Sequence, residues 1–575
     1  MKEGFSPKHK TTTTEEQTTA IYAPIDKPLS IVSCPGSGKT YVLIERIEHL
    51  FKTFQDQKLL VLTFSNMACW ELSNRLEKKK ISSDFVHVNT FHSFGLRILR
   101  QFAHVINRSG FRLISEDEQK ELIMKIDNSN GFDISKALRI IERYKIMKIL
   151  PVEWELFYRK YENKLKEQNC VDMCDLIKIP VEILTENPKV LELFQRMYVY
   201  CLVDEMQDVS NDQLELIRLI FSKSGRITVV GDDDQSIYGF RGANPDSLMK
   251  FDQFFPNPSV LYMTMCFRSE YHIVKAMNSV INHNKKRFMK TITSFEQTPP
   301  HKKVRVICAD SIKDMIETIS KTFNRYNTNA VLNRFHKDID VMKKCFKEMN
   351  IQVAQNVSLL VIENKEAKRV ISALYYINNI ANINYCLDGN DRKSLDSLIE
   401  RGINQISLSK KINMIASSLN LDTLAVSILK HEASLQNGNE SIDAFVKSVE
   451  NIKYDQWSEG LKLITCHQSK GLEFDCVCIP FISKWIKSSN SIEEERRLFY
   501  VAMSRAKSEL VLFYLKNDKK PPFIQEIDQS VVNDNRIRDQ MMLAENSQRP
   551  NETPKLNQKL CLLHLPKRSS SFSLP

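Results

Sequence analysis

The chain has 575 residues, of which 42% are hydrophobic and 26% are charged, so we expect a globular protein of several domains. Its 81 basic and 70 acidic residues give a net charge of +11, which permits a polyanionic partner without requiring one. No apolar run is long enough to cross a membrane, and residues 1–16 hold no apolar stretch typical of a secretory signal. We therefore expect an intracellular protein without membrane contact. The spacing of its 13 cysteines favours neither a zinc site nor an iron–sulfur cluster.

The first elements along the chain indicate a parallel α/β sheet. Strands are expected at residues 29–32, 59–64, 198–203 and 226–231, and helices at 41–51 and 67–80. Between these strands, residues 95–195 are poor in glycine and rich in Glu, Lys, Ile and Leu. This composition predicts a helical insertion into the first domain.

A second α/β unit is expected to begin near residue 270 and to contain another helical insertion. Its strands are expected at residues 304–308, 330–332, 461–465 and 476–480. The resulting fold class is two parallel-sheet α/β domains, each with a mainly helical insertion. The expected division is 1–94 and 196–269 for the first domain, 95–195 for its insertion, 270–380 and 460–529 for the second domain, and 381–459 for the second insertion. Residues 530–575 lack clear periodicity and predict a disordered tail.

A phosphate-binding loop follows the first strand. Backbone amides in such a loop surround phosphates at the start of a helix, the lysine reaches the β- and γ-phosphates, and the hydroxyl that follows it binds Mg²⁺. Ser33 stands where the general pattern has glycine. The residues expected to hold the nucleotide phosphates are Pro35, Gly36, Ser37, Gly38, Lys39 and Thr40, and Thr40 is also a candidate metal ligand.

Two carboxylates end the strand at residues 198–203. Asp204 is expected to bind Mg²⁺, and Glu205 to orient and deprotonate an attacking water. Two arginines, Arg268 and Arg505, are candidates for stabilising negative charge on a phosphoryl group in the transition state.

The most informative stretch is residues 230–243, Val-Gly-Asp-Asp-Asp-Gln-Ser-Ile-Tyr-Gly-Phe-Arg-Gly-Ala. It places polar groups suited to a phosphate beside aromatic rings suited to a nucleobase. A strand followed by an acidic turn accounts for its beginning but leaves Gln235, Tyr238, Phe240 and Arg241 unexplained. We therefore expect this stretch to join a nucleotide site to a nucleic-acid site.

Taken together, these motifs resemble the UvrD/Rep/PcrA group of superfamily 1 helicases, in the same order and over about residues 14–515. Further stretches similar to family motifs are Leu62–Asn66 with Ala68, Thr90–Ser93, Asp204–Asp208, Thr465–Phe474 and Glu494–Lys507. The resemblance implies two RecA-like domains with ATP bound between them. It also implies 3′→5′ movement on single-stranded DNA and separation of duplex DNA.

The resemblance further assigns roles around the nucleotide. It implies that Gln17 reads the adenine, that Phe267 stacks on it and that Glu473 touches the ribose. It also implies that Gln235 senses the γ-phosphate. The expected cofactors are ATP and Mg²⁺, with Glu205, Asp204, Gln235, Arg268 and Arg505 as the catalytic set.

The expected strand site combines aromatic rings with polar and basic side chains. Bases gain about 1–3 kcal/mol each by stacking on such rings, whatever their identity. Polar and basic groups beside the rings would hold phosphates and sugars. The candidate strand contacts are Phe64, Asn66, His92, Tyr238, Phe240, Arg241, Thr465 and His467.

Several positions depart from the family pattern. Phe240 stands where the family usually has Trp, and Met265 and Cys266 replace polar residues before the aromatic–arginine pair. Tyr41 follows Thr40 where relatives often have Arg, and the second insertion is short. These changes bear on affinity, rate and control of unwinding more than on the class of reaction.

Several functional alternatives remain beside the DNA helicase. The motifs do not separate unwinding from the stripping of proteins off single strands, or DNA from RNA. A strand-binding protein without ATPase activity is disfavoured by the complete catalytic set. A helicase–nuclease subunit is disfavoured because the chain after the last motif holds no carboxylate–lysine nuclease cluster.

Partners and location are less constrained. We expect single-stranded and tailed duplex DNA as partners and a monomer or weak dimer, acting in repair, recombination or replication. The location would be the nucleus of a eukaryote or the cytoplasm of a bacterium. Residues 553–575 are basic and hold no Asp or Glu, so an interaction or mitochondrial targeting role is an alternative to simple disorder.

Overall fold

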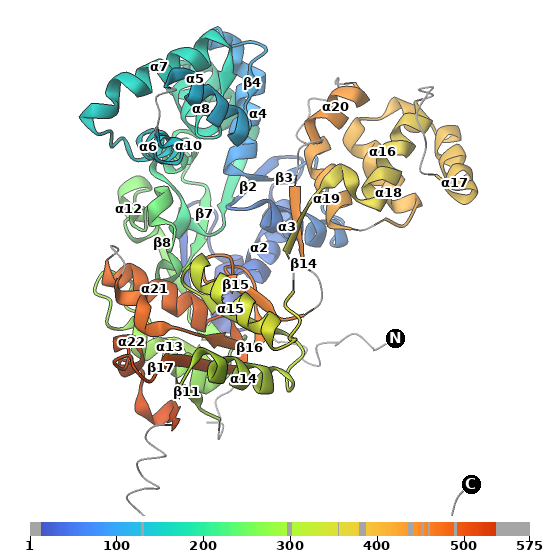
Figure 1. Ribbon diagram of the computed structural model, residues 1–575. Helices are drawn as coiled ribbons and strands as arrows, with labels where there is room; N and C mark the ends of the chain where they lie inside the picture. Colours follow the sequence, from blue (N-terminus) through green and yellow to red (C-terminus); the bar gives the residue numbers. More distant parts are fainter. Residues whose placement is uncertain are drawn as a thin grey trace, which may run out of the picture.

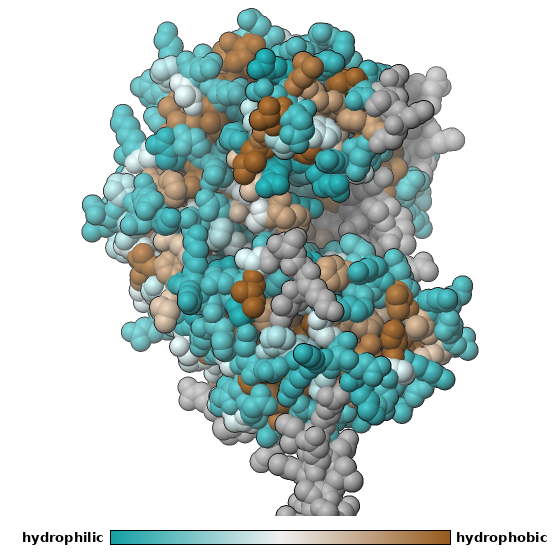
Figure 2. Space-filling view, turned by 60° about the vertical axis from the view of Figure 1, so that its left-hand side comes forward, coloured by the Kyte–Doolittle hydropathy of each residue, from teal (hydrophilic) through white to brown (hydrophobic). Residues whose placement is uncertain are grey.

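The computed structural model shows two RecA-like α/β domains, each with a helical insertion (Figure 1). It describes residues 13–127, 132–295, 302–354, 356–378, 387–421, 423–434, 441–449, 453–457, 460–487 and 491–535. The face drawn in Figure 2 is mostly hydrophilic, with apolar residues in separate patches. Among the described residues, every helix is too short or too polar to traverse a bilayer.

The first sheet has six parallel strands in the order β3-β2-β6-β7-β1-β8. Its strands are β1 (Leu29–Ser33), β2 (Lys58–Thr63), β3 (Val86–Thr90), β6 (Tyr198–Val203), β7 (Ile227–Gly231) and β8 (Ser259–Met263). Helices α1 (Glu15–Tyr22), α2 (Lys39–Thr53), α3 (Asn66–Lys78), α10 (Asn211–Phe221), α11 (Asp246–Met249) and α12 (Phe251–Phe254) belong to the same domain. Because β1, β7 and β6 are adjacent and parallel, the segments that follow them meet at one edge of the sheet.

The first insertion divides between two hydrophobic cores. Its helices are α4 (Phe91–Phe102), α5 (Glu116–Ile126), α6 (Ile134–Met147), α7 (Glu155–Glu167), α8 (Asp175–Glu186) and α9 (Pro188–Met197), with short strands β4 (Arg112–Leu113) and β5 (Cys170–Val171). Residues of α4, α8 and α9 share a core with β2 and β6, whereas α5, α6 and α7 form a core of their own. The ends of the stretch 95–195 therefore pack on the first sheet, and only its middle forms a separate lobe.

A close helix contact and a buried ion cluster attach this lobe. A Cβ at Gly95 in α4 would lie 1.7 Å from the Leu176 carbonyl oxygen in α8, so only glycine fits there. The buried Lys145 ammonium of α6 lies 2.7 Å from carboxylate oxygens of both Asp172 and Asp175. These contacts give the segment around residue 172 a structural role.

The second sheet has six parallel strands in the order β15-β12-β16-β17-β11-β18. Its strands are β11 (Val304–Ala309), β12 (Asn329–Asn333), β15 (Lys462–Thr465), β16 (Phe474–Ile479), β17 (Ala506–Leu515) and β18 (Val532–Asp534). This sheet is covered by helices α13 (Tyr271–Ile281), α14 (Ile312–Phe323), α15 (His336–Glu348), α21 (Ile492–Met503) and α22 (Pro522–Gln525). A small parallel strand pair lies at the junction between the domains and consists of β9 (Met265–Cys266) and β10 (Thr293–Ser294).

The expected disordered tail, residues 530–575, was placed too early, because it includes strand β18 (Val532–Asp534). Val532 pairs with Val304, so β18 extends the second sheet at its edge. A strand of three residues is too short for its periodicity to be seen in the sequence. Residues 536–575, including the basic segment from residue 553, lie outside the described residues.

The second insertion is a helical lobe joined to the second domain by an antiparallel strand pair. The pair is β13 (Asn356–Leu360) with β14 (Lys453–Trp457), and the helices are α16 (Lys365–Ile377), α17 (Gly389–Glu400), α18 (Leu408–Ser418), α19 (Leu424–Ser434) and α20 (Ile442–Val449). Buried residues of α16 belong to the core of this lobe, which therefore starts before residue 381. The lobe contacts α3 of the first domain, where Lys430 lies 3.7 Å from Glu77 (Figure 1).

The contact between this lobe and the first domain should depend on pH. Burial against the first domain raises the pKa of Glu432 in α19 to about 7, and Arg100 of α4 only partly opposes this. A raised pKa means that the docked state binds the proton more tightly, so docking is favoured at low pH and loses up to about 3 kcal/mol as pH rises from about 4.5 to above 7. We expect the lobe to be more protected from limited proteolysis at pH 6 than at pH 8.

The Glu432→Gln variant should lose this pH dependence and remain protected at pH 8. Glu400→Gln, which changes an exposed carboxylate on α17 of the same lobe, serves as the control and should behave like the wild type. Equal pH dependence in Glu432→Gln and the wild type would contradict this assignment.

Candidate functional site: a nucleotide site and a strand site between two domains

The phosphate-binding loop has the backbone that a phosphate requires. Gly36 and Gly38 have φ angles of +69° and +81°, which favour glycine. Gly38 caps α2 without a side-chain hydrogen bond, so the first amides of the helix face outward for an anion. Lys39 starts this helix, and its ammonium makes no hydrogen bond or ion pair within the described part of the chain.

Gln17 holds this loop from the neighbouring helix α1. Its amide nitrogen donates to the Ser37 carbonyl over 3.0 Å, and its amide oxygen accepts from the Thr14 N–H. The side chain is therefore fixed beside the loop. Its expected role in reading adenine stays a prediction.

The two carboxylates after β6 have opposite protonation tendencies. Burial, then the neighbouring Glu205, raises the pKa of Asp204 to about 7. The pKa of Glu205 is lowered because Lys39 and Lys470 together outweigh its burial. Glu205 is thus held ionised, as a base requires, whereas Asp204 would be ionised by a cation bound beside it.

The oxygen donors here suit Mg²⁺. One Asp204 oxygen accepts from the Glu205 amide over 2.9 Å, and among the described residues the other has no hydrogen-bond donor. Thr40 lies in the first turn of α2, which follows β1, and only β7 separates β1 from β6 in the sheet. Mg²⁺ is commonly bound by one or two such protein oxygens together with phosphates of the substrate.

Gln235 lies between the two domains. Its amide nitrogen donates to Asp232 over 2.7 Å, and its amide oxygen accepts from the Arg505 guanidinium over 3.0 Å. Its backbone carbonyl also accepts from Lys470 over 3.0 Å. The side chain at the centre of the stretch 230–243 is therefore bonded to both domains.

The two candidate arginines lie beside each other at the edge of the second sheet. Arg268 donates to Glu473 over 2.8 Å and to the Ser504 carbonyl over 3.2 Å, and a Cβ at Gly36 would lie 2.5 Å from the Arg268 Cβ. Burial, then the charge of Arg268, lowers the pKa of Arg505 to about 9. Two adjacent guanidinium groups that repel each other are stabilised by an anion between them, which suits a phosphate.

The expected base and ribose contacts lie at the same edge. The Phe267 N–H donates to the Gly36 carbonyl over 2.9 Å, and its half-buried ring packs against Phe295. Cys266, one of the departures from the family pattern, is buried beside Gly36. Glu473 is paired with Arg268 and Lys507, so its ribose contact remains a prediction.

Aromatic rings from both domains form a second cluster close to Gln235. Tyr238 stacks on Phe64 with ring centroids 5.1 Å apart, and Phe240 meets the ring of His467 edge-on at 5.5 Å. The Arg241 guanidinium lies 5.6 Å from the Phe240 centroid. Phe240 is 60% exposed, so an exposed ring and a cation are available to a base and a phosphate.

The remaining strand candidates differ in exposure. Asn66 begins α3 and is exposed, whereas His92 is partly buried in the first turn of α4, where burial lowers its pKa. Burial also lowers the pKa of His467 to about 4, so both histidines are neutral at pH 7. Thr465 is buried and its hydroxyl bonds to Gln468, so it does not lie with the exposed candidates.

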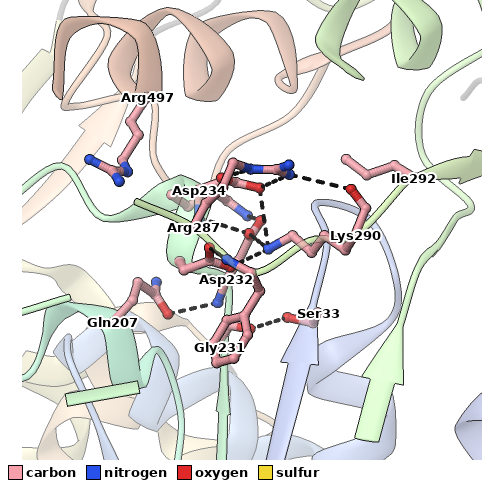
Figure 3. Close-up of polar contacts among 12 residues, drawn as sticks. Ser33, Gln207, Gly231, Asp232, Asp234, Arg287, Lys290, Ile292 and Arg497 are labelled. Carbon is pink, nitrogen blue, oxygen red and sulfur yellow. Dashed lines mark hydrogen bonds and ion pairs between the residues drawn. The ribbon is translucent and has the colours of Figure 1, made fainter. Parts of the chain in front are cut away.

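Several residues at this junction were not singled out from the sequence. Lys470 forms a buried ion pair with Asp208 and lies 5.1 Å from the Tyr238 ring centroid. Arg287 and Lys290 bind the three carboxylates at residues 232–234 (Figure 3). Three adjacent aspartates after a buried strand indicate that buried cations must neutralise them. The sequence does not identify those cations, because the ion pairs join residues more than 50 positions apart.

Two parallel-sheet domains, a phosphate-binding loop at their junction and a cluster of aromatic rings beside it are typical of nucleotide-driven nucleic-acid motors. Comparison with known proteins agrees. The model of the UvrD/REP helicase N-terminal domain matches residues 13–256, and that of the UvrD-like helicase C-terminal domain matches residues 403–517. The chain belongs to the UvrD/Rep family of DNA helicases.

Several relatives match over most of the chain. The ATP-dependent DNA helicase Rep of Buchnera aphidicola subsp. Schizaphis graminum is 29% identical over 85% of this chain and 91% of its own length. A probable DNA helicase II homolog of Mycoplasma capricolum is 27% identical over 90% and 87%, respectively. The ATP-dependent DNA helicase PcrA of Staphylococcus epidermidis is 28% identical over 87% and 83%.

The exposed ring of Phe240 gives a test of the strand site. We expect Phe240→Ala to weaken binding of a fluorescent oligo-dT strand about tenfold, through loss of one base stack, with the KM for ATP changed less than twofold. Phe240→Trp keeps the stack with a larger ring and should bind at least as tightly as the wild type. Equal losses of strand and ATP binding in Phe240→Ala would show that the ring supports the local fold and does not contact the strand.

Proposed function

We propose that this protein hydrolyses ATP to move 3′→5′ along single-stranded DNA and to separate the duplex ahead of it. The observation that carries the proposal is the position of Gln235. Its side chain bonds to Arg505 in the second domain, while Tyr238 and Phe240, a few residues along the chain, form the aromatic cluster. A change in the contacts between the nucleotide and Gln235 can therefore reach the strand site through only a few residues of chain.

The nucleotide half of the proposal follows from the residues around the phosphate loop. The loop amides and Lys39 bind the phosphates, and Glu205 holds the attacking water and accepts its proton. Mg²⁺, held by Thr40 and Asp204, would neutralise charge on the β- and γ-phosphates. Arg268 and Arg505 stabilise the charge that develops, which contributes a factor of about 10³–10⁵ in related phosphoryl transfers.

Nucleotide binding must also rearrange these residues. Arg505 now bonds to Gln235, and Arg268 to Glu473. A γ-phosphate offers both arginines a stronger, fully charged acceptor. Because Arg505 and Gln235 lie on opposite domains and Arg268 lies at the junction between them, exchanging these partners changes how the domains are held together. The aromatic cluster lies across the same junction.

The strand half rests on stacking and phosphate contacts. Phe64, Tyr238 and Phe240 stack bases without regard to sequence, as a motor on DNA requires. The preference for DNA and the 3′→5′ direction are supported by the family and by the motifs of residues 230–243. The relatives are bacterial, which favours action in the bacterial cytoplasm, in repair, recombination or replication, by a monomer or weak dimer.

The catalytic assignment predicts two inactive variants with different defects. Lys39→Ala should lose ATP binding, whereas Glu205→Gln should bind ATP but hydrolyse it at least about a hundredfold more slowly. DNA-stimulated ATPase and binding of a fluorescent nucleotide measure the two properties. Lys189→Ala and Glu192→Gln, which change exposed residues of α9, are the matched controls and should be unaffected.

Retained hydrolysis in Glu205→Gln would overturn the assignment of the base. Direction and substrate are tested by comparing 3′-tailed, 5′-tailed and blunt DNA duplexes with their RNA counterparts. Unwinding of only the 3′-tailed DNA supports the proposal, whereas protein displacement from single strands without unwinding would favour a stripping translocase.

A further inference from the structure

Three adjacent carboxylates at the end of β7 are fully buried, and two cations from one later segment neutralise them (Figure 3). Lys290 donates to Asp232 over 2.7 Å and also bonds to Asp233. Arg287 binds Asp234 through two hydrogen bonds of 2.8 and 2.7 Å. Lys290 and Arg287 lie between α13 and β10, far along the chain from the carboxylates.

These contacts give the two cations different neighbours. Asp232 accepts from Lys290 through Oδ1 and from the Gln235 amide through Oδ2, and the second bond is also 2.7 Å. Asp234, the partner of Arg287, makes no hydrogen bond to Gln235 among the described residues. Lys290 is thus joined to Gln235 through one carboxylate, whereas Arg287 is not.

We propose that Lys290 is a positioning residue for the ATPase reaction, acting through Asp232 on Gln235. By fixing Asp232, Lys290 holds the amide nitrogen of Gln235 on that carboxylate, so that the amide oxygen faces Arg505. The result is a continuous path, Lys290–Asp232–Gln235–Arg505, from the junction segment to the phosphate site. This inference rests on the role proposed above for Gln235.

The segment that carries Lys290 is also attached to the second domain. Arg496 of α21 donates to Asn284 over 2.6 Å, and Arg497 donates to the Lys286 carbonyl over 2.6 Å. Helix α21 ends immediately before Arg505. Movement of this helix therefore acts on Gln235 at both ends of the path, directly through Arg505 and indirectly through Lys290.

A double-mutant cycle tests whether Lys290 acts through Gln235. In the wild-type background we expect Lys290→Met to lower the kcat of DNA-stimulated ATPase by at least about tenfold, with the KM for ATP changed less than about threefold. In the Gln235→Ala background the same change should have little further effect on kcat. Equal effects of Lys290→Met in both backgrounds would overturn the inference, because a merely structural loss persists without Gln235.

A second pair of variants separates positioning from charge balance. Lys290→Met leaves an additional uncompensated carboxylate, and adding Asp233→Asn restores the net charge of the cluster without restoring the bond to Asp232. We expect the double variant to recover the thermal midpoint of the wild type while its kcat stays at least about tenfold low. Recovery of kcat to within twofold would overturn the inference, and this variant decides the matter if Lys290→Met alone does not fold.

Arg287→Lys is the matched control, since it keeps the charge beside Asp234 and leaves the path to Gln235 intact. It replaces the paired hydrogen bonds to Asp234 and should lower the thermal midpoint, but its kcat should stay within about threefold of the wild type because the path to Gln235 is unchanged. If the wild type and Arg287→Lys are active and Lys290→Met is also fully active, the positioning role of Lys290 is refuted and the proposed function is not. A wild type without ATPase activity would instead refute the proposed function.

Discussion

The burial of Asp232, Asp233 and Asp234 is the constraint on which the rest of this junction depends. Each buried carboxylate costs several kcal/mol unless it is paired, so Lys290 and Arg287 must lie where they do. Their segment connects α13 of the second domain to the junction strands, so charge neutralisation also fixes where the second domain meets the first. Gln235 then lies between Asp232 and Arg505, and the aromatic rings that follow it contact Phe64 of the first domain and His467 of the second.

The nucleotide and strand sites share residues instead of communicating over a distance. Lys470 illustrates this, because its ammonium pairs with Asp208, donates to the Gln235 carbonyl and lies over the ring of Tyr238. Asp208 in turn belongs to the stretch that carries Asp204 and Glu205. A single cation from the second domain therefore touches the acidic motif, Gln235 and the ring of Tyr238. This arrangement couples the sites through direct bonds, which is a physical basis for coupling that sequence motifs alone do not supply.

The sequence predicted the features that are encoded locally. The strand, glycine loop and helix around Lys39 form one continuous pattern, and the resemblance placed the remaining motifs in order. Elements without local periodicity were missed, such as β18, which is visible only through its pairing with Val304. Ion pairs between residues far apart in the sequence were also missed, because no local pattern around Lys290 indicates that its partner is Asp232. Thr465 shows what a motif position leaves open, since the motif suggested a strand contact and the fold pairs its hydroxyl with Gln468, so its strand contact stays a prediction.

The central claim is that occupancy of the nucleotide site changes the strand site through Gln235. It is tested most directly by measuring the affinity of the wild type for a fluorescent oligo-dT strand with and without a non-hydrolysable ATP analogue and Mg²⁺. The account predicts that the two affinities differ by at least about fivefold, the lower end of usual coupling between sites, and that Gln235→Ala removes the difference. Equal affinities in the wild type, with the analogue shown to be bound, would contradict it.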